Sequence, residues 1–327
     1  MNPFLKQVAD HYFKEENIRR RCFIFPNRRS MLFFRKYLCE NVADSRENPI
    51  LAPQMLTIND LFSKASGARV ADRVRLLIDL YASYRELNPA AETLDEFIFW
   101  GDMMLGDFND VDKYLVDPVQ LFRNVSDYKE MQDDFSHLTP VQKEAINAFI
   151  KHFKDEAGRL TVHLDTDDPD VKGKFLQIWN IMLPLYEKFN ALLDAKGLAY
   201  EGKVYRHLAY QLKTHPAEDI FAAVFPRVEK FVFVGLNALN EAEKTVLRKL
   251  RDASMAEFCW DWSGDMIRDP QNRSSVFLSD NVKEFPQAFS LDAEGLPLPH
   301  FIVVSVASSV GQAKRLQDII GQIADMQ

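Results

Sequence analysis

The sequence predicts an α/β protein in which a parallel-sheet domain is divided by a large, all-helical insertion. Near both ends of the chain, short apolar runs alternate with amphipathic helical patterns, whereas the middle shows helical spacing alone. Strands that alternate with helices indicate a parallel sheet with both faces covered. We therefore expect the sheet domain to comprise residues 1–60 and 225–327, and the helical insertion to comprise residues 61–224.

The first sixty residues have the order helix, strand, turn, helix. Residues 4–15 place apolar side chains near one face of a helix. The run Cys22–Phe25 is short, apolar and aromatic, as expected for a buried strand, and is closed by Pro26. Helical spacing resumes over Ser30–Leu38, and Ser30 is the predicted N-cap of that helix.

Apolar residues at i, i+3, i+4 and i+7 predict a series of helices in the middle of the chain, starting near Thr57–Ser63. The predicted helices are Arg73–Leu87, Leu94–Leu105, Pro140–Phe153 and Phe175–Leu193. Thr93 and Glu96 have the spacing of a capping box, and Pro140 suits the first turn of a helix. The polar, acidic stretch Thr161–Gly173 is predicted to be a loop.

Strands and helices alternate again after Pro226. The predicted strands are Phe231–Val234, Ala256–Trp260 and Phe301–Val306, and the predicted helices are Glu241–Arg251 and Gly311–Ile323. Gly264–Leu298 is rich in loop-forming residues. We expect the three strands to lie beside Cys22–Phe25 in one parallel sheet.

The composition favours a cytoplasmic protein without a membrane partner. The length of 327 residues is typical of about two domains. The polar segment Met1–Asn17 differs from a secretory signal, and no apolar run approaches the roughly 18 residues that span a bilayer. Cys22, Cys39 and Cys259 are far apart and odd in number, so they predict neither a disulfide framework nor a metal site.

The charge distribution is uneven. A net charge of −8 argues against nucleic-acid binding by the whole surface, but phosphate binding depends on where the basic residues lie. Seven basic residues and no acidic residue lie between Asn17 and Cys39. A local basic patch is therefore predicted near the N-terminus.

Three motifs look catalytic but lack necessary groups. Gly197–Val204 matches the phosphate loop G-x-x-x-x-G-K, yet Val204 cannot supply the hydroxyl that binds Mg²⁺, so we predict a helix C-cap at Gly197 followed by another helix. The D-x-K triplet Asp170–Lys172 lies in a polar stretch and is interpreted as solvated surface. Asp107–Asp112 lacks the glycine and glutamate of a calcium loop and is interpreted as a capped junction between helices. No catalytic residue, cofactor or metal is expected in this chain.

Several segments together resemble the AddB/RexB family, the inactivated-helicase partners in bacterial double-strand-break repair, and in particular the Bacteroidetes-type proteins labelled PD-(D/E)XK nuclease family proteins. The similar segments are Cys22–Ser30 for helicase motif Ia of superfamily 1, Met55–Leu61 for motif Ib, Leu198–Arg206 and Phe231–Lys244 for the run into motif II, and Phe301–Ile320 for the crossing toward a second motor domain. The resemblance implies a RecA-like domain 1A that lacks its P-loop, with a helical 1B insertion.

The departures from an active motor imply that ATP is not hydrolysed. No glycine occurs in Met1–Arg21, where a P-loop would precede motif Ia. Gly235 and Leu236 stand where motif II has two carboxylates, and Trp260–Ser263 stands where motif III has a glutamine. The family's exonuclease lies toward the C-terminus of a much longer chain, so we expect these residues to be a fragment or a shortened form of such a protein.

The resemblance implies a DNA-binding scaffold within a repair and recombination helicase–nuclease. The predicted nucleic-acid-binding residues are Asn27, Arg28, Arg29, Ser30, Thr57 and Asn59, because ligands bind beyond the carboxyl ends of parallel strands and motif Ia contacts single-stranded DNA there. The implied partners are single-stranded or end-containing DNA and an AddA-like helicase–nuclease subunit. Two alternatives remain open: a protein–protein module that docks a motor subunit, and a metal-dependent nuclease that uses acids within Asp165–Asp170.

Overall fold

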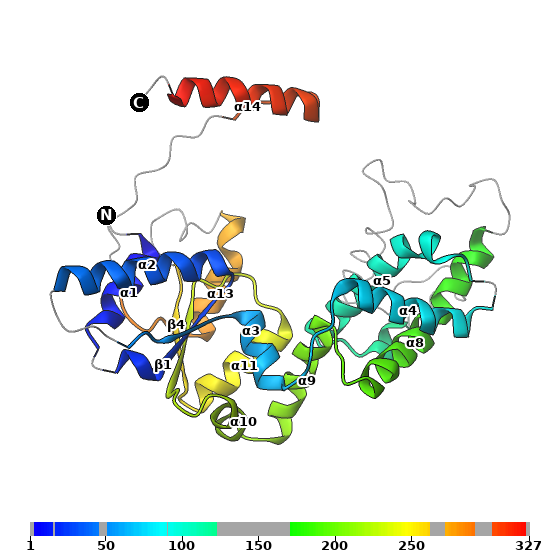
Figure 1. The fold of residues 1–327 in the computed structure, drawn as a ribbon, viewed down its shortest axis with the longest axis horizontal. Helices are drawn as coiled ribbons and strands as arrows, with labels where there is room; N and C mark the ends of the chain where they lie inside the picture. The colour runs from blue at the N-terminus through cyan, green and yellow to red at the C-terminus, as the bar shows by residue number, and fades with distance from the viewer. Residues whose placement is uncertain are drawn as a thin grey trace.

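A four-stranded, all-parallel sheet is the centre of the computed structural model, which describes residues 3–15, 17–45, 51–89, 91–122, 171–261, 272–291 and 303–324. The strand order is β2-β1-β3-β4 (Figure 1). The strands are β1 (Arg21–Phe25), β2 (Gln54–Thr57), β3 (Lys230–Val234) and β4 (Ala256–Cys259). The predicted α/β class with a parallel sheet is confirmed, and β1, β3 and β4 match three predicted strands to within one residue.

The pairing of β1 with β3 joins two segments that lie about 200 residues apart in the sequence. Cys22 lies opposite Phe231, and Ile24 lies opposite Phe233. The strand β2, which pairs with β1 on the other side, was not predicted. It has only four residues and directly follows Pro53, so the sequence carries no run long enough to reveal a strand.

The predicted strand Phe301–Val306 is wrong for its described part. Phe301 and Ile302 lie outside the described residues, and residues 303–306 belong to no strand and are largely exposed. The outer edge of β4 is instead occupied by residues 287 and 288. Gln287 Oε1 accepts a hydrogen bond from the Trp260 amide at 2.8 Å, and the Ala288 amide donates to the Phe258 carbonyl at 2.8 Å.

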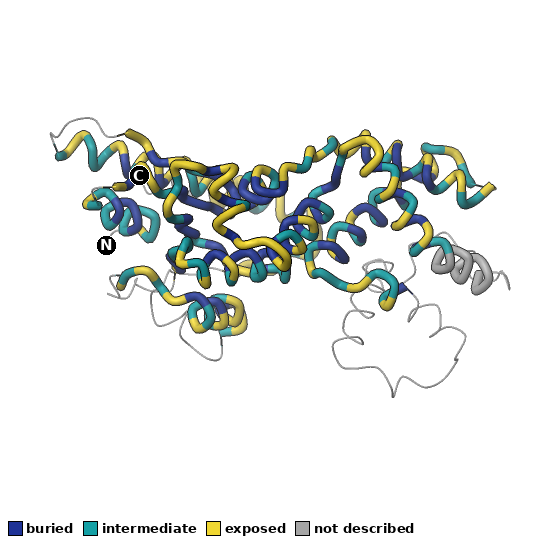
Figure 2. Tube along the Cα trace, turned by 90° about the horizontal axis from the view of Figure 1, so that it is seen from below, coloured by how far each residue is buried: buried dark blue, intermediate teal, exposed yellow. Residues whose placement is uncertain are grey.

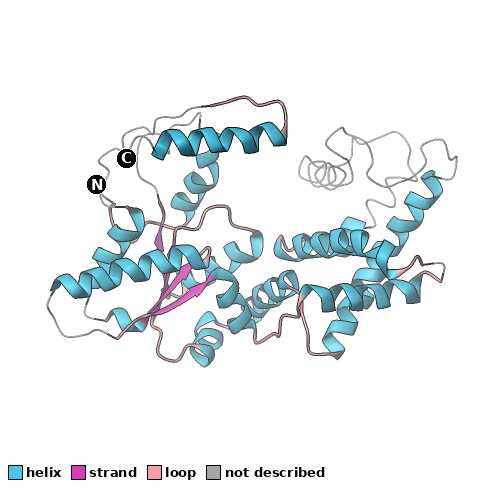
Figure 3. Cartoon of the chain, turned by 45° about the horizontal axis from the view of Figure 1, so that its top comes forward, coloured by secondary structure: helices cyan, strands magenta, loops and turns pink. Residues whose placement is uncertain are grey.

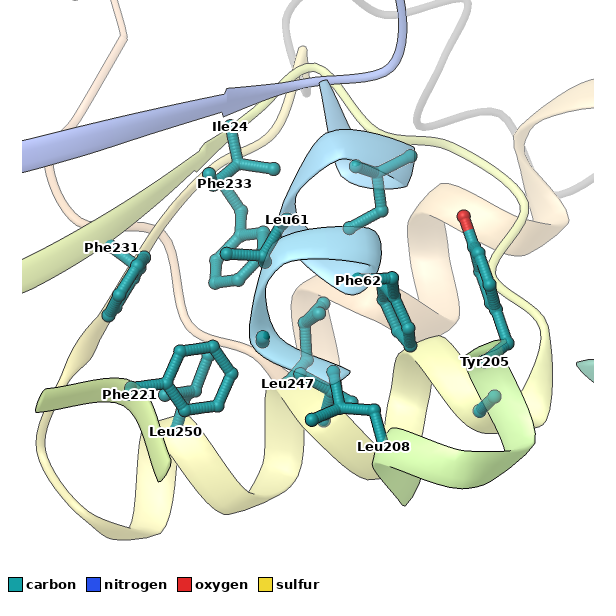
Figure 4. Close-up of a cluster of buried hydrophobic side chains, with 14 of the residues drawn as sticks. Ile24, Leu61, Phe62, Tyr205, Leu208, Phe221, Phe231, Phe233, Leu247 and Leu250 are labelled. Atoms are coloured by element: carbon teal, nitrogen blue, oxygen red, sulfur yellow. The ribbon is translucent and has the colours of Figure 1, made fainter. Parts of the chain in front are cut away.

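Side-chain alternation along the strands creates two apolar layers. On one face, Phe23, Phe25 and Val232 pack against the helices α1 (Phe4–Phe13) and α2 (Arg28–Ser45), and the short 3₁₀ helix η1 (Ile18–Arg20) precedes β1. On the other face, Ile24 and Phe233 point toward Leu61 of α3 (Figure 4). The helices that cover this second face are α3 (Ile58–Ser66), α9 (Glu201–Thr214), α10 (Ala217–Val224) and α11 (Glu241–Asp252).

In a second lobe, the described residues form helices and no strand of the sheet (Figure 3). Its helices are α4 (Arg73–Leu87), α5 (Leu94–Lys113) and α8 (Val171–Ala195). The predicted bounds of α4 are confirmed, as is the capping box of Thr93 and Glu96 at the start of α5. The predicted helix Pro140–Phe153 lies outside the described residues, and α8 already includes the last residues of the predicted loop Thr161–Gly173.

The chain passes between the two lobes near residues 66–72 and 195–200. A parallel bridge joins Val70 to Ala199 there. Leu61, Val204 and Phe221 all belong to the apolar cluster on the sheet, so packing groups α3, α9 and α10 with the sheet. The boundaries expected from the sequence, 61–224, instead assign α9, α10 and the part of α3 after residue 60 to the insertion.

The last described helices are α13 (Val276–Glu284), which follows the 3₁₀ helix η2 (Arg273–Ser275), and α14 (Ser309–Ala324). Buried residues are concentrated in the sheet and along the inner faces of the helices, whereas α14 is exposed over most of its length (Figure 2). Among the described residues, no helix has the length and apolar character needed to cross a bilayer.

Candidate nucleic-acid interface

The carboxyl ends of all four strands lie at one edge of the sheet. Phe25 is opposite Thr57, and Val234 is opposite Cys259. The segments that follow these strands therefore meet at the same edge, which is where open parallel sheets bind their ligands. The predicted residues Asn27–Ser30 follow β1 at this edge, and Thr57 and Asn59 lie at the end of the neighbouring strand β2.

The turn after β1 is shaped by Asn27. Its side-chain oxygen accepts hydrogen bonds from the Ser30 amide at 2.9 Å and from the Ser30 hydroxyl at 3.2 Å. Asn27 thus satisfies an amide that the first turn of a helix leaves without a partner. Because α2 begins at Arg28, the prediction that Ser30 caps this helix was wrong.

Arg28 and Arg29 occupy the first turn of α2 and are exposed. Neither forms an ion pair within 4.0 Å of an acid among the described residues, whereas Arg20, Arg21 and Arg73 all do. The free amides of a helix N-terminus add a partial positive charge at the same place. Two guanidinium groups and a helix N-terminus together favour an anion such as phosphate.

Arg35 extends this basic surface and was not among the predicted site residues. It is exposed, and it lies seven residues after Arg28, which puts both on one face of α2. Leu32, 52% exposed, lies between them on that face, beside Phe33, 42% exposed. The helical period of the sequence is the signal that would have added Arg35 to the site.

Thr57 and Asn59 have structural partners. The Thr57 hydroxyl donates to Asp60 Oδ2 at 2.7 Å and accepts from the Asp60 amide at 3.2 Å, which makes it the N-cap of α3. Asn59 is exposed, and its side-chain oxygen accepts a hydrogen bond from the Tyr205 hydroxyl. Thr57 is buried, so Asn59 is the more accessible of the two predicted contacts.

A pocket of about 300 Å³ opens at the same edge, between the start of α1, α2 and the end of β3. Its lining residues are Pro3, Phe4, Leu5, Ser30, Phe33, Tyr37, Val234, Gly235 and Asp261. None of them is a lysine or arginine, so the pocket offers no cation to a triphosphate. Gly235 has a φ of +67°, a backbone conformation that glycine adopts most easily.

The loop that resembles a phosphate loop is a helix–turn–helix, as predicted. Gly197 has a φ of +62°, and the amide of Leu198 donates to the Leu193 carbonyl at 2.9 Å, which closes the end of α8. Lys203 lies in the first turn of α9 and pairs with Asp194 at 2.8 Å. The lysine of this motif is thus engaged by a neighbouring acid.

Asp107–Asp112 forms part of α5, so the predicted junction between helices was wrong. Asp112 is fully buried and accepts hydrogen bonds from Tyr186 at 2.6 Å, from Tyr200, and from Arg206 Nε at 2.5 Å. Burial and the neighbouring Asp112 raise the pKa of Tyr186 and of Tyr200, so both phenols remain donors. Burial, with a smaller contribution from Asp110, raises the pKa of Asp107 to about 7.

The described residues contain no group of three or more His, Cys, Asp or Glu side chains placed to hold a metal ion. The acids Asp165–Asp170 of the nuclease alternative lie outside the described residues. The sequence matches no protein-family model, and no curated protein matches it. The geometry of the carboxyl edge is therefore the basis for a functional proposal.

Proposed function

We propose that this chain binds single-stranded DNA at the carboxyl edge of its sheet and acts as a non-catalytic, RecA-like scaffold of an AddB-like repair helicase–nuclease. One observation carries the proposal: Arg28 and Arg29 are exposed, have no acidic partner among the described residues, and sit at a helix N-terminus on the edge where parallel sheets bind ligands. Asn59 and Arg35 add polar and basic groups nearby. The resemblance of Cys22–Ser30 to motif Ia favours single-stranded DNA as the anion.

Charge-neutralising contacts of this kind give binding that is independent of sequence and sensitive to salt. Replacing both arginines, Arg28→Ala/Arg29→Ala, should weaken binding to every labelled oligonucleotide in a fluorescence-anisotropy salt series. The salt slope should fall by about one to two units, because each phosphate contact contributes roughly 0.7 for a single strand.

The matched control is Arg19→Ala/Arg227→Ala. These two exposed arginines precede β1 and β3 and therefore lie toward the opposite, amino edge of the sheet. The control removes the same charge from the chain and should leave the slope nearly unchanged. Equal losses in the two double variants would show that net charge, and not the carboxyl edge, determines binding.

The two alternatives give different outcomes in the same assay. Cleavage of the oligonucleotide that requires added Mg²⁺ or Mn²⁺ would support the nuclease alternative. No binding at low salt would support the protein–protein module.

An AddA-like subunit stays the predicted protein partner, and α14 offers a suitable surface. Its exposed apolar residues Leu316 and Ile320 lie four residues apart and therefore on the same side of the helix. Leu316→Glu/Ile320→Glu should prevent co-purification of the two subunits without changing DNA affinity. Co-purification at the wild-type level would exclude α14 as the contact.

A further inference from the structure

A second pocket, of about 290 Å³, lies where the chain passes between the two lobes. Its lining residues come from the end of α3, the turn between α8 and α9, and one face of α9: Ser66, Gly67, Ala68, Arg69, Asp194, Gly197, Leu198, Ala199, Lys203 and His207. The backbones of Arg69 and Ala199 are joined by a hydrogen bond of 2.9 Å from the Ala199 amide to the Arg69 carbonyl. This hydrogen bond holds together the two backbone segments that line the pocket.

Three basic side chains line this pocket. Arg69 and His207 are exposed and form no ion pair with a described residue. Lys203 lies one helical turn before His207 on the same face of α9, and only 18% of its side chain is exposed. Its amine also donates to the Asn190 carbonyl at 3.0 Å, which holds it in place.

Asp194 is the one acid among the lining residues, and its side chain is 70% exposed. Because this carboxylate is mostly surrounded by solvent, it can turn away from Lys203 when another anion approaches the amine. Both lining glycines, Gly67 and Gly197, have positive φ angles and open space where a Cβ would be. The entrance therefore remains uncovered by side chains on these two turns.

The pocket is separate from the carboxyl edge. The nine residues of α3 run from Thr57, at that edge, to Gly67, at the pocket, which corresponds to about 13 Å of helix. The length of this helix separates the pocket from the carboxyl edge. An anion in the pocket would need its own binding groups, and Arg69, Lys203 and His207 provide them.

We propose that this pocket between the lobes binds a phosphate group, with Arg69 and Lys203 as its cations and His207 as an additional hydrogen-bond donor. The phosphate can belong to a DNA strand that continues from the carboxyl edge, which rests on the function proposed above, or to a free phosphate compound, which does not. Two probes distinguish these sources: inorganic pyrophosphate in calorimetric titration and a labelled oligo-dT in fluorescence anisotropy.

The first variant is Arg69→Ala/His207→Ala, which truncates two exposed side chains and leaves the backbone bridge in place. We expect pyrophosphate affinity to fall by about threefold or more, and the oligo-dT salt slope to fall by roughly 0.7 if the strand is the ligand. The matched control is Arg227→Ala/His215→Ala, an exposed pair outside the pocket, which should change neither measurement.

The second variant, Asp194→Asn, predicts a gain. Removing the competing carboxylate should raise pyrophosphate affinity by about two- to fivefold at low salt, the range for one exposed charge pair. Damage to the fold cannot produce such a gain. A fall of pyrophosphate affinity alone in Arg69→Ala/His207→Ala would assign the pocket to a free phosphate compound.

If the wild-type chain binds pyrophosphate but no oligonucleotide, the proposed phosphate site is supported and the proposed function is rejected. The proposed phosphate site would be rejected if the wild-type chain bound no pyrophosphate, or if neither variant changed the affinity for pyrophosphate.

Discussion

The two lobes of this chain are held together by different kinds of core. The sheet lobe packs apolar layers on both faces, with Phe23 and Val232 on one side and Ile24 and Phe233 on the other. The helical lobe also has an apolar cluster, but Asp112 is buried beside it with hydrogen bonds to residues of α8 and α9. The core of the sheet lobe is therefore formed by apolar side chains that point to opposite faces of the strands. The core of the helical lobe depends in addition on the hydrogen bonds of one buried carboxylate.

Arg206 connects the sheet lobe to the buried polar groups of the helical lobe. It extends from α9, which packs on the sheet, and reaches Asp112 and the carbonyls of Val111 (2.8 Å) and Val116 (2.7 Å) in the helical lobe. α9 therefore belongs to both lobes and holds them in one relative orientation. The pocket between the lobes lies along the same helix.

The largest expected effect is the loss of the buried carboxylate. Asp112→Ala leaves Arg206 without its ionic partner and two buried tyrosines without an acceptor, so we expect it to lower the free energy of unfolding by about 3–5 kcal/mol. Asp110→Ala is the matched control, because Asp110 lies on the same helix but is exposed. Denaturant unfolding of both variants measures the difference, and a loss below about 1 kcal/mol for Asp112→Ala would mean that the polar core is dispensable.

A glycine pair tests how closely α9 packs on α5. A Cβ at Gly202 would lie 2.6 Å from the Asn109 carbonyl oxygen, whereas a Cβ at Gly106 would meet nothing within 4 Å. Gly202→Ala should therefore destabilise by about 1–3 kcal/mol through overpacking. Gly106→Ala should stabilise by about 0.5–1 kcal/mol, because alanine is the better helix former. Changes of the same sign in thermal unfolding would contradict the close contact between the helices.

Asp107 predicts a pH dependence confined to the helical lobe. Its pKa is raised in the folded chain to about 7, above an unfolded value of about 3.9. The folded state thus binds the proton more tightly, and stability should fall as pH rises from about 4 to about 7. Asp107→Asn should remove this part of the slope, and Asp110→Asn should reduce it by less. A slope that is unchanged in Asp107→Asn would reject the raised pKa.

The smallest expected effect concerns the pocket at the carboxyl edge of the sheet lobe. The lining of that pocket contains no lysine or arginine, and no carboxylate stands at Gly235 or Leu236 to bind Mg²⁺. Titration of Mg·ATP into the Arg69→Ala/His207→Ala variant, which lacks two binding groups of the pocket between the lobes, should give no heat beyond dilution. Micromolar binding in this titration would contradict the inactive-motor interpretation.

Much of the fold was predictable because its signals are local. The continuous apolar run of Phe231–Val234 and the apolar spacing in Arg73–Leu87 depend only on residues close together in the chain. The capping box of Thr93 and Glu96 depends on three residues. The short strand β2 was missed and the strand over residues 303–306 was wrong, because pairing depends on which sheet edge is open and not on β-propensity alone.

The candidate site was predictable only in part. The basic run and the position of Arg28 and Arg29 after a strand were visible in the sequence. Arg69, Lys203 and His207 were not connected by any sequence motif, since Arg69 lies more than 130 residues before the other two. Their meeting depends on the bridge between Val70 and Ala199.

The sequence by itself determined the α/β class, most helix and strand positions and the basic turn after β1, because hydrophobic period and capping act between residues close in the chain. The tertiary structure alone decided that β2 pairs with β1, that Asp112 is a buried acceptor and not a surface acid, and that Asn27 rather than Ser30 caps α2. Pairing and burial are contacts between segments up to about 200 residues apart, and local pattern carries no information about which distant segment will supply the partner.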